Sequence, residues 1–215
     1  MQDLKKTTAS KFISNPLEAA YLGKLTFKKS VWLQEDLLQL ALKSKNSFVI
    51  GLEHPAVLTL GYRAEAATEI LSTNALPVER VSRGGLATVH AEGQLVIYPI
   101  LNLRELNLGV RDYVCLLLKT TSDLLTSLGI ESFIDENSVG VFTKTGKIAF
   151  CGVQVKNGVS QHGISLNVRN DLTLFNSIRS CGITRPTFDR LCEHDVNMTL
   201  NEVFSAWLKI FRSRF

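Results

Sequence analysis

The 215-residue chain lacks the features that mark several large classes of protein. No apolar run approaches the roughly 20 residues that a membrane-spanning helix needs. The N-terminal MQDLKKTTASKF carries charge without the apolar stretch of a signal peptide behind it. There is no G-x-x-x-x-G-K-[ST] phosphate loop, and no basic run with interleaved aromatic residues of the kind that binds nucleic acid. We therefore expect neither a membrane nor a nucleic acid as a partner.

Cysteine is scarce and its spacing is irregular. The four cysteines, Cys115, Cys151, Cys181 and Cys192, form no C-x-x-C pair, and no His/Cys cluster has zinc spacing. We interpret them as reduced thiols of a cytoplasmic protein with no metal. The net charge of +4 is modest and suggests an acidic macromolecular partner without identifying one.

The remaining composition favours one globular unit. With 45% apolar residues the chain can bury one substantial core, so we expect a single domain over residues 1–215, with residues 1–27 partly mobile. Helical periodicity predicts helices over 28–43, with Trp32 and Leu42 on the buried side, and over 110–128, with Cys115 buried. Strand-like runs lie between these helices, and Thr199 and Glu202 form a capping-box pattern. This mixture predicts an α+β (mixed α/β) fold around one large sheet.

The most informative stretch is KIAFCGVQVKNGVSQHGISLNVRNDLTLFNSIRSCG, residues 147–182. Its two strand-like runs meet at Asn157-Gly158, the strongest short-range signal for a β-hairpin. The hairpin would hold Lys147 and His162 on one platform, and the following segment would bring Cys181 back to it. A thiol, an amine and an imidazole could then meet. A nearby cation favours the reactive thiolate, and an amine in an apolar site loses basicity and can move protons near neutral pH.

Each of these residues also has a plainer interpretation. Cys181, which Gly182 follows, is either a nucleophile beside an oxyanion site or a buried structural thiol. Lys147 alone would be a solvated lysine after a turn. His54, His90 and His162 each end or interrupt an apolar strand, where a hydrogen-bonded structural histidine is commoner than a catalyst. His194 lies in a polar segment and is assigned no role.

Arg83-Gly84-Gly85 lies between two strand-like runs. Its glycines would allow a ligand to approach the backbone, and free N–H groups there can hold an oxygen. The arginine could bind a carboxylate or phosphate. The alternative is an ordinary tight turn with a surface arginine.

Five motifs in order resemble those of the lipoyl(octanoyl) transferases, which move an octanoyl group from acyl carrier protein to a lipoyl-domain lysine. EHPAVLTLG is similar to EHPPVYTLG, RGGLATVHAEGQLVIYPI to RGG-x-x-T-x-H-G-P-G-Q-L-V-x-Y-P, and KIAFCGVQV to KIA-x-x-G-V-x-V. HGISLNV is similar to HG-x-ALNV, and FNSIRSCGI to F-x-x-I-x-PCGI. Together the motifs span about Phe48 to Ile183. The departures are Ala91-Glu92 for Gly-Pro, Ser165 for alanine and Ser180 for proline.

The resemblance implies a fold like the biotin and lipoate protein ligases, a mixed sheet flanked by helices. It implies that Cys181 carries the acyl group and that Lys147 activates it, with no cofactor. The residues that it implies line the acyl tunnel and thioester site are Arg83, Gly84, Gly85, Leu86, Ala87, Thr88, Val89, His90, Phe150, Cys151, Gly152, His162, Gly163 and Ile164.

The implied donor is octanoyl-acyl carrier protein. The implied acceptors are the apo lipoyl domains of 2-oxoacid dehydrogenases and the glycine cleavage H protein, and we expect the enzyme to be a monomer. Three alternatives remain open at this point. The chain could be an ATP-dependent lipoate–protein ligase on the same fold, an inactive module that binds lipoyl domains, or a thioester hydrolase.

Overall fold

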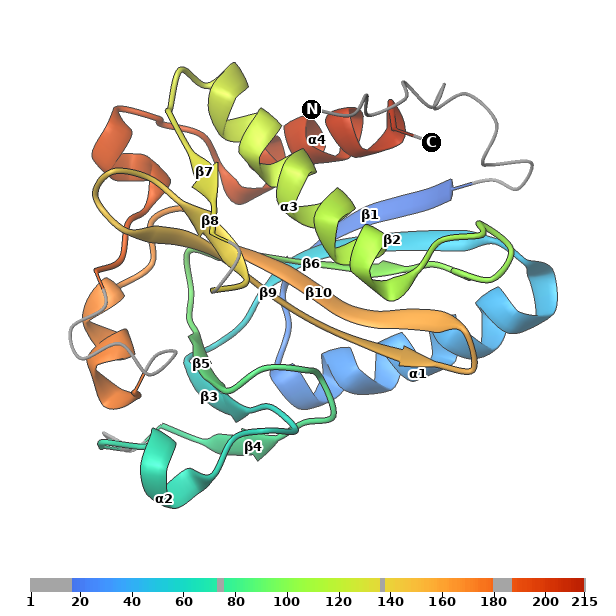
Figure 1. The fold of residues 1–215 in the computed structure, drawn as a ribbon, viewed down its shortest axis with the longest axis horizontal. Helices are drawn as coiled ribbons and strands as arrows, with labels where there is room; N and C mark the ends of the chain where they lie inside the picture. The colour runs from blue at the N-terminus through green and yellow to red at the C-terminus, as the bar shows by residue number, and fades with distance from the viewer. Residues whose placement is uncertain (1–16, 73–75, 136–137, 180–186, 215) are drawn as a thin grey trace, which may run out of the picture.

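A computed structural model describes residues 17–72, 76–135, 138–179 and 187–214. Its centre is a seven-stranded mixed sheet in the order β1-β2-β6-β10-β9-β8-β7 (Figure 1). In that order the strands are Leu17–Lys24, Ser47–Glu53, Gln94–Ile100, Val159–Asn167, Lys147–Lys156, Gly140–Phe142 and Phe133–Ile134. β1 runs parallel to β2, and the other neighbours are antiparallel. The apolar run QLVIYPI forms β6, which lies inside the sheet.

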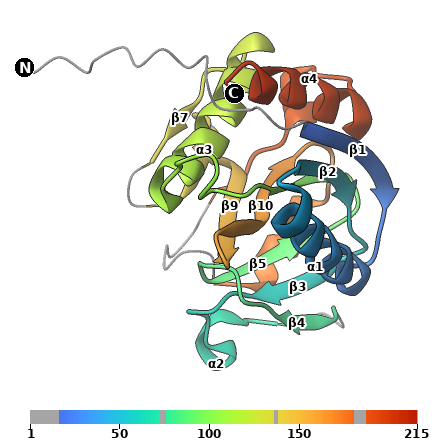
Figure 2. The same ribbon diagram turned by 90° about the vertical axis from the view of Figure 1, so that its right-hand side faces the viewer.

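Helices cover both faces of this sheet (Figures 1 and 2). α3 (Val110–Ser127) and α4 (Leu200–Arg212) pack on one face, and α1 (Phe27–Ser44) packs on the other. Successive residues of a strand point to opposite faces. Val49 and Ile97 accordingly join the core under α3 and α4, while their neighbours Ile50 and Val96 join the core under α1. The large sheet is thus buried on both sides, as its nearly continuous apolar strands indicate.

A smaller sheet lies beside the large one. It has the order β4-β3-β5, with strands Val78–Arg80, Val57–Leu60 and Ala87–His90. The short helix α2 (Ala66–Glu69) follows β3, and the 3₁₀ helix η1 (Leu172–Ser177) closes the small core with Phe175. A second 3₁₀ helix, η2, spans Leu191–His194. Among the described residues, no helix is long and apolar enough to cross a membrane.

Two local predictions are confirmed in detail. The β9–β10 hairpin turns at Asn157-Gly158, whose φ angles of 54° and 87° suit the type I′ turns that such hairpins favour. At α4, the Thr199 side chain accepts from the Glu202 backbone, and the Glu202 side chain accepts from the Thr199 backbone. This reciprocal capping box fixes where the last helix begins.

Three side chains that were expected to be buried on two helices are exposed. α1 buries Phe27, Gln34 and Leu38, whereas Trp32 is 59% exposed and Leu42 is also exposed. A helix turns about 100° per residue, so Trp32 lies about 200° from Gln34 and faces solvent. The same geometry exposes Cys115 on α3. Periodicity predicted the two helices but not the exposure of these three side chains.

Strand β1 was not recognised in the sequence. Its residues alternate between half-buried and exposed side chains, and Leu17, Ala19 and Tyr21 pack against the core. The pattern is weak in the sequence because two of the exposed positions, Ala20 and Leu22, are themselves apolar. Residues 1–16 lie outside the described residues.

Candidate active site

One cavity of about 550 Å³ lies between the two sheets and the start of α3. Its volume is within the roughly 300–1,000 Å³ typical of small-molecule sites. All the residues that the family resemblance implied for substrate binding line it, except Val89, which packs in the core of the small sheet. The sequence motifs therefore converge on one space, although they come from β5, β9, β10 and the loop before β5. Whether they bind substrate stays a prediction.

Arg83 is not the surface arginine that the plainer interpretation expected. It is 8% exposed, so it is not a surface arginine. Its Nη1 donates to the carbonyls of Gly84 and Leu86, and its Nη2 donates to the carbonyl and hydroxyl of Thr59, at 2.8–3.1 Å. Burial lowers the pKa of Arg83 to about 10. The guanidinium therefore ties the loop to β3, and its binding of a carboxylate or phosphate stays a prediction.

The backbone of the same loop is also engaged. Gly84 N–H donates to the Val153 carbonyl at 2.9 Å, so this group is not free to hold a substrate oxygen as the sequence suggested. A side chain at Gly61 would meet the Gly85 carbonyl at 2.4 Å. The glycines thus let the loop pack against β9 and β3, and the loop forms a wall of the cavity.

Three buried histidines gather at one side of the cavity. His54 is held by the Leu25 carbonyl, 2.6 Å from Nδ1, and the Tyr98 hydroxyl, 2.9 Å from Nε2. His90 Nδ1 lies 2.7 Å from Gln94 Oε1, and the His54 and His90 rings are 5.6 Å apart. The fully bonded His54 matches the structural interpretation, whereas His90 and His162 line the cavity.

Burial is the main cause of the low pKa values of these histidines. It lowers the pKa of His54 to about 4, that of His90 to about 3 and that of His162 to about 4. The positive Arg83 and the neighbouring imidazoles lower the pKa of His90 and His162 further. All three rings are therefore neutral near pH 7.

Lys147 is buried at the start of β9 and is 5% exposed. Its Nζ donates to Ser138 Oγ at 3.1 Å and lies 5.3 Å and 5.1 Å from the ring centres of Phe142 and Phe150. Ser138 and Phe150 line the cavity. The interpretation of Lys147 as a solvated surface lysine is therefore wrong. The aromatic faces favour the ammonium form, while burial opposes it.

Lys147 and His162 both lie on the β9–β10 hairpin, as the sequence predicted. His162 pairs with Val153, six residues along β9 from Lys147, so their backbone positions lie on the order of 20 Å apart along the strand. The Lys147 amine reaches back along the strand to 5.1 Å from the Phe150 ring centre. The expected meeting with the thiol involves Cys181, which lies outside the described residues, and it stays a prediction.

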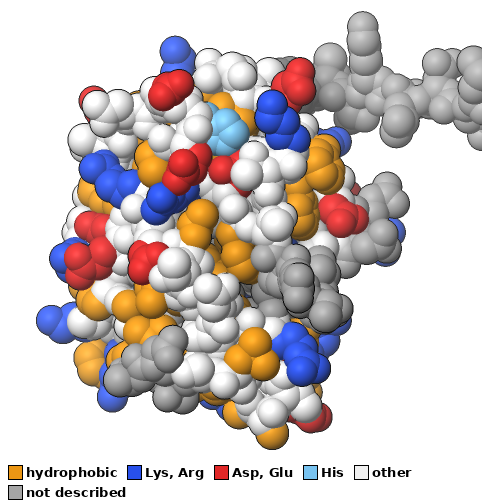
Figure 3. Space-filling model, turned by 90° about the vertical axis from the view of Figure 1, so that its left-hand side faces the viewer, with side chains coloured by type: hydrophobic (Ala, Val, Ile, Leu, Met, Phe, Trp, Pro, Cys, Tyr) orange, Lys and Arg blue, Asp and Glu red, His pale blue; other side chains and the backbone are white. Residues whose placement is uncertain are grey.

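Cys181, like Gly182 and Ser180, lies outside the described residues. Figure 3 colours the side chains of the described residues by type and leaves all other residues grey. The described chain resumes at Thr187, whose carbonyl accepts from Lys147 N–H at 2.9 Å. Before the gap, Arg179 N–H donates to the Glu69 carbonyl at 2.7 Å. The start of β9 is therefore bonded directly to the chain that follows the Cys181 segment.

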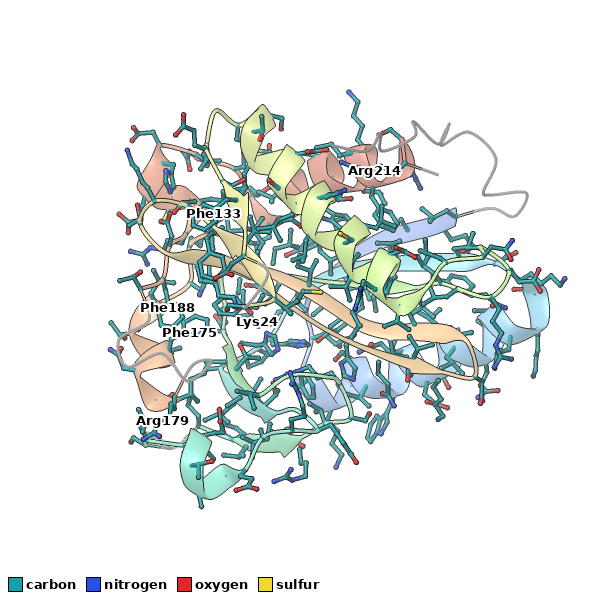
Figure 4. All side chains as sticks on the ribbon, viewed as in Figure 1. Lys24, Phe133, Phe175, Arg179, Phe188 and Arg214 are labelled. Carbon is teal, nitrogen blue, oxygen red and sulfur yellow. The ribbon has the colours of Figure 1, made fainter. Side chains whose placement is uncertain are left out.

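A stack of aromatic rings supports this end of the cavity. Phe150, Phe175 and Phe188 have ring centres 4.5–6.0 Å apart, and Figure 4 shows Phe175 and Phe188 side by side. They come from β9, η1 and the segment after Thr187. The ring of Phe150 thus contacts both the aromatic stack and the Lys147 amine.

Sequence reasoning missed a polar cluster next to Lys147. Asp189 is 1% exposed and its carboxylate accepts from the Thr143 hydroxyl, with His194 Nε2 at 2.7 Å. Asp189 N–H donates to the Lys147 carbonyl at 3.0 Å. These residues fix the backbone of Lys147. The polar segment around them has no periodicity that could have revealed this, and His194 was assigned no role.

The other described cysteines differ from one another. Cys151 is half-buried and lines the cavity, and burial raises its pKa to about 12 although the Lys147 charge opposes the shift. Cys115 and Cys192 are exposed. Among the described residues, no three His, Cys, Asp or Glu side chains are grouped as metal ligands would be.

Two departures from the family motifs fall on described residues. Glu92 is exposed and forms an ion pair with Lys24 at 2.7 Å, while the Gly93 N–H donates to Glu53 Oε2. The extra charge therefore lies at the surface. Ser165 is buried and lines the cavity, where it adds a hydroxyl to an otherwise mainly apolar wall.

Comparison with solved structures confirms the predicted fold. Lipoate-protein ligase A bound with ATP aligns with a TM-score of 0.74 at 16% identity, covering 94% of this chain and 85% of that one. A biotin acetyl coenzyme A carboxylase synthetase from Helicobacter pylori, with bound biotinylated ATP, gives a TM-score of 0.57 at 16% identity, covering 93% and 76%. At these identities the likeness shows the fold alone.

Sequence comparison identifies the family. Residues 28–212 match the family model of the lipoyl protein ligase A/B catalytic domain. An octanoyltransferase of Halorhodospira halophila is 43% identical over 148 residues, which cover 69% of this chain and 67% of that protein. An octanoyltransferase of Dichelobacter nodosus is 37% identical over 165 residues, covering 76% and 82%. The chain therefore belongs to the lipoyl protein ligase A/B catalytic domain family and, within it, to the octanoyltransferases, which are acyltransferases.

Proposed function

We propose that this chain transfers an octanoyl group from acyl carrier protein to a lysine of an apo lipoyl domain through a thioester on Cys181. The observation that carries the proposal is the position of Lys147. Its amine is buried at one end of a mainly apolar cavity, and its backbone is bonded to the chain that follows the Cys181 segment. An acyl chain needs such a cavity, and acyl transfer needs a group that moves protons at its end.

In the first step the Cys181 thiolate attacks the carbonyl carbon of the octanoyl thioester. Backbone N–H groups near the thiol stabilise the tetrahedral oxyanion. The carbon–sulfur bond to the carrier's phosphopantetheine arm then breaks, and protonated Lys147 gives its proton to the departing thiolate. The products are octanoyl-Cys181 and the free carrier thiol, and Lys147 is left neutral.

In the second step the ε-amine of the target lysine attacks octanoyl-Cys181. Neutral Lys147 takes a proton from that amine as the carbon–nitrogen bond forms, and the Cys181 thiolate leaves. The product is an amide on the lipoyl domain, and the enzyme returns to its starting protonation state. Because the thioester already supplies the driving force, neither step consumes a nucleotide or needs a metal.

The proposed partners are those that the family resemblance implies. The donor is octanoyl-acyl carrier protein, and the acceptors are lipoyl domains of 2-oxoacid dehydrogenases and the glycine cleavage H protein. We further propose that the enzyme acts in the cytoplasm as a monomer of one domain. An acidic carrier suits the net charge of +4.

The decisive experiment omits ATP. The protein is incubated with octanoyl-acyl carrier protein and an apo lipoyl domain, and the mass of the lipoyl domain is followed. The proposal predicts a gain of one octanoyl group without ATP and no gain with the Cys181→Ala variant. Transfer that requires ATP and free octanoate would instead identify a ligase. Loss of octanoyl from the carrier without gain on the lipoyl domain would identify a hydrolase, and no reaction would leave a binding module.

A further inference from the structure

A second groove lies directly beside the acyl cavity. It has a volume of about 570 Å³ and runs between the first turns of α1 and strand β4. Its lining includes Val31, Trp32 and Val81, and two residues that also line the acyl cavity, Phe27 and His162. The side chains of Phe27 and His162 therefore form the partition between the acyl cavity and this groove.

The separating side chains are closely packed. Phe27 and His162 are each 6% exposed. The Phe27 ring stacks on His90 at 6.1 Å with an interplanar angle of 13°, and it meets the edge of His54 at 5.3 Å. His162 lies edge-on to Tyr98 at 6.0 Å. The partition is thus built of rings that are neutral near pH 7 and hold one another in place.

The position of His162 is fixed by an unusual backbone conformation. Its φ of 56° lies in the left-handed region, which a residue other than glycine rarely adopts. The His162 N–H donates to Gln34 Oε1 at 2.7 Å, and Gln34 is 1% exposed on α1. The first turns of α1 therefore supply both Phe27 and the anchor of His162. Strain held in this way commonly serves a functional site.

The partition lies further along the cavity than the Lys147 amine. The amine is 5.1 Å from the Phe150 ring centre, and His162 pairs with Val153, three residues beyond Phe150. At about 3.3 Å per residue this separation is about 10 Å, close to the length of an extended octanoyl chain. An acyl chain attached near Lys147 would extend along β9 and β10 towards Phe27 and His162. The methyl end of the chain would meet these rings.

We propose that Phe27 and His162 form the end wall that limits the length of the acyl chain, an inference that rests on the proposed acyl transfer. A chain that fills the cavity makes apolar contacts to its end, whereas a longer chain must displace packed rings. Beyond the wall the groove offers Val31, Trp32 and Val81 as apolar lining. Opening the wall should join the two spaces and admit longer chains.

The test compares carriers loaded with hexanoyl, octanoyl, dodecanoyl and tetradecanoyl groups. In the unaltered enzyme kcat/KM for dodecanoyl should be at least about 10-fold below that for octanoyl, since even one surplus methylene can cost that much in a closed pocket. Phe27→Ala should raise the dodecanoyl-to-octanoyl ratio by about 10-fold or more. His162→Gly should do the same, because glycine accepts the left-handed backbone. Phe27 is on α1 and His162 is on β10, so if one variant misfolds, the other can still test the proposal.

Trp32→Ala is the matched control, because Trp32 lines the groove and not the acyl cavity. Alone it should leave the chain-length profile unchanged, and combined with Phe27→Ala it should reduce the gain for dodecanoyl. An unchanged ratio in both folded wall variants would overturn the proposal.

A binding measurement separates this proposal from the proposed function. The thermal stabilisation of the protein by dodecanoate, relative to octanoate, should increase in Phe27→Ala. If the unaltered enzyme transfers no acyl group but Phe27→Ala shows this increase, the proposed function fails and the wall stands. If transfer proceeds and neither variant changes the relative effect of the two acids, the wall is wrong and the function stands.

Discussion

The two ends of the cavity between the sheets are built from different kinds of side chain. At one end the Lys147 amine lies between a hydroxyl and two aromatic rings, and its backbone is pinned by Thr187 and Asp189. At the other end three imidazoles are buried, and burial keeps their pKa values at about 3–4. A group that must both hold and release a proton near neutral pH belongs to the first end. The second end is suited to apolar packing.

The largest effect should come from removing proton transfer at the first end. Lys147→Arg keeps a positive charge but cannot deprotonate in a protein. Acylation of Cys181 should persist to some extent, whereas transfer to the target lysine should slow by about 10²–10⁴-fold, the usual worth of a general acid–base group. Lys147→Ala should impair both steps. Single-turnover kinetics that measure acylation and transfer separately provide the check.

Equal transfer rates in Lys147→Arg and the parent enzyme would contradict the assignment of proton transfer to the Lys147 end of the cavity. Lys147 would then be only an electrostatic neighbour.

Acidification should act on the second end. The pKa values of His54, His90 and His162 in the folded state lie below the ordinary value of 6.5. Between those values the unfolded chain binds more protons, so stability is full above about pH 6.5 and falls as pH drops towards about 4. The loss should be on the order of 2 kcal/mol per histidine between about pH 7.5 and about pH 5. Urea unfolding across this range measures it.

The variant His54→Gln sharpens that measurement. It removes one buried titrating group, so the slope of stability against pH should become shallower even if the variant is less stable at pH 7. A slope equal to that of the parent would show that the histidines do not control acid stability.

The stability of the loop around Arg83 should depend on the Arg83 side chain. Arg83→Ala removes four charge-assisted hydrogen bonds to the backbone and to Thr59. We expect a loss of about 2–3 kcal/mol in the free energy of unfolding, and a KM for the carrier that rises more than kcat falls. Arg63→Ala is the control, because exposed Arg63 lines the same cavity and should change stability by less than about 0.5 kcal/mol. A large kcat loss at unchanged KM would assign Arg83 to the chemistry.

The smallest effect should come from Cys151. Its thiol lines the cavity, but its pKa of about 12 leaves almost no thiolate near neutral pH. Cys151→Ala should keep most of the activity and lose about 1 kcal/mol of stability. An inactive Cys151→Ala beside an active Cys181→Ala would exchange the roles of the two thiols.

The sequence predicted those parts of the fold that local chemistry determines. The hairpin follows from Asn157-Gly158, and the start of α4 follows from the Thr199 capping box, because each signal acts within a few residues. The residues that line the cavity were predicted from motifs, through the resemblance to a family. Their convergence on one space is not visible in spacing alone.

What the sequence could not predict depends on contacts between distant segments. Arg83 gave no sign that Thr59 would accept two of its hydrogen bonds. Asp189 contacts Thr143 and His194 across different segments. Trp32 was placed on the wrong side of α1 because periodicity does not state which stripe meets the sheet. The wall of Phe27 and His162 likewise exists only once α1 packs on β10.

The central claim is that acyl transfer passes through Cys181, and the intact mass of the enzyme tests it most directly. After exposure to octanoyl-acyl carrier protein, without an acceptor, the mass should rise by one octanoyl group. Hydroxylamine, which cleaves thioesters, should remove the added mass, and Cys181→Ala should gain none. An adduct that forms on Cys181→Ala, or that survives hydroxylamine, would contradict the account.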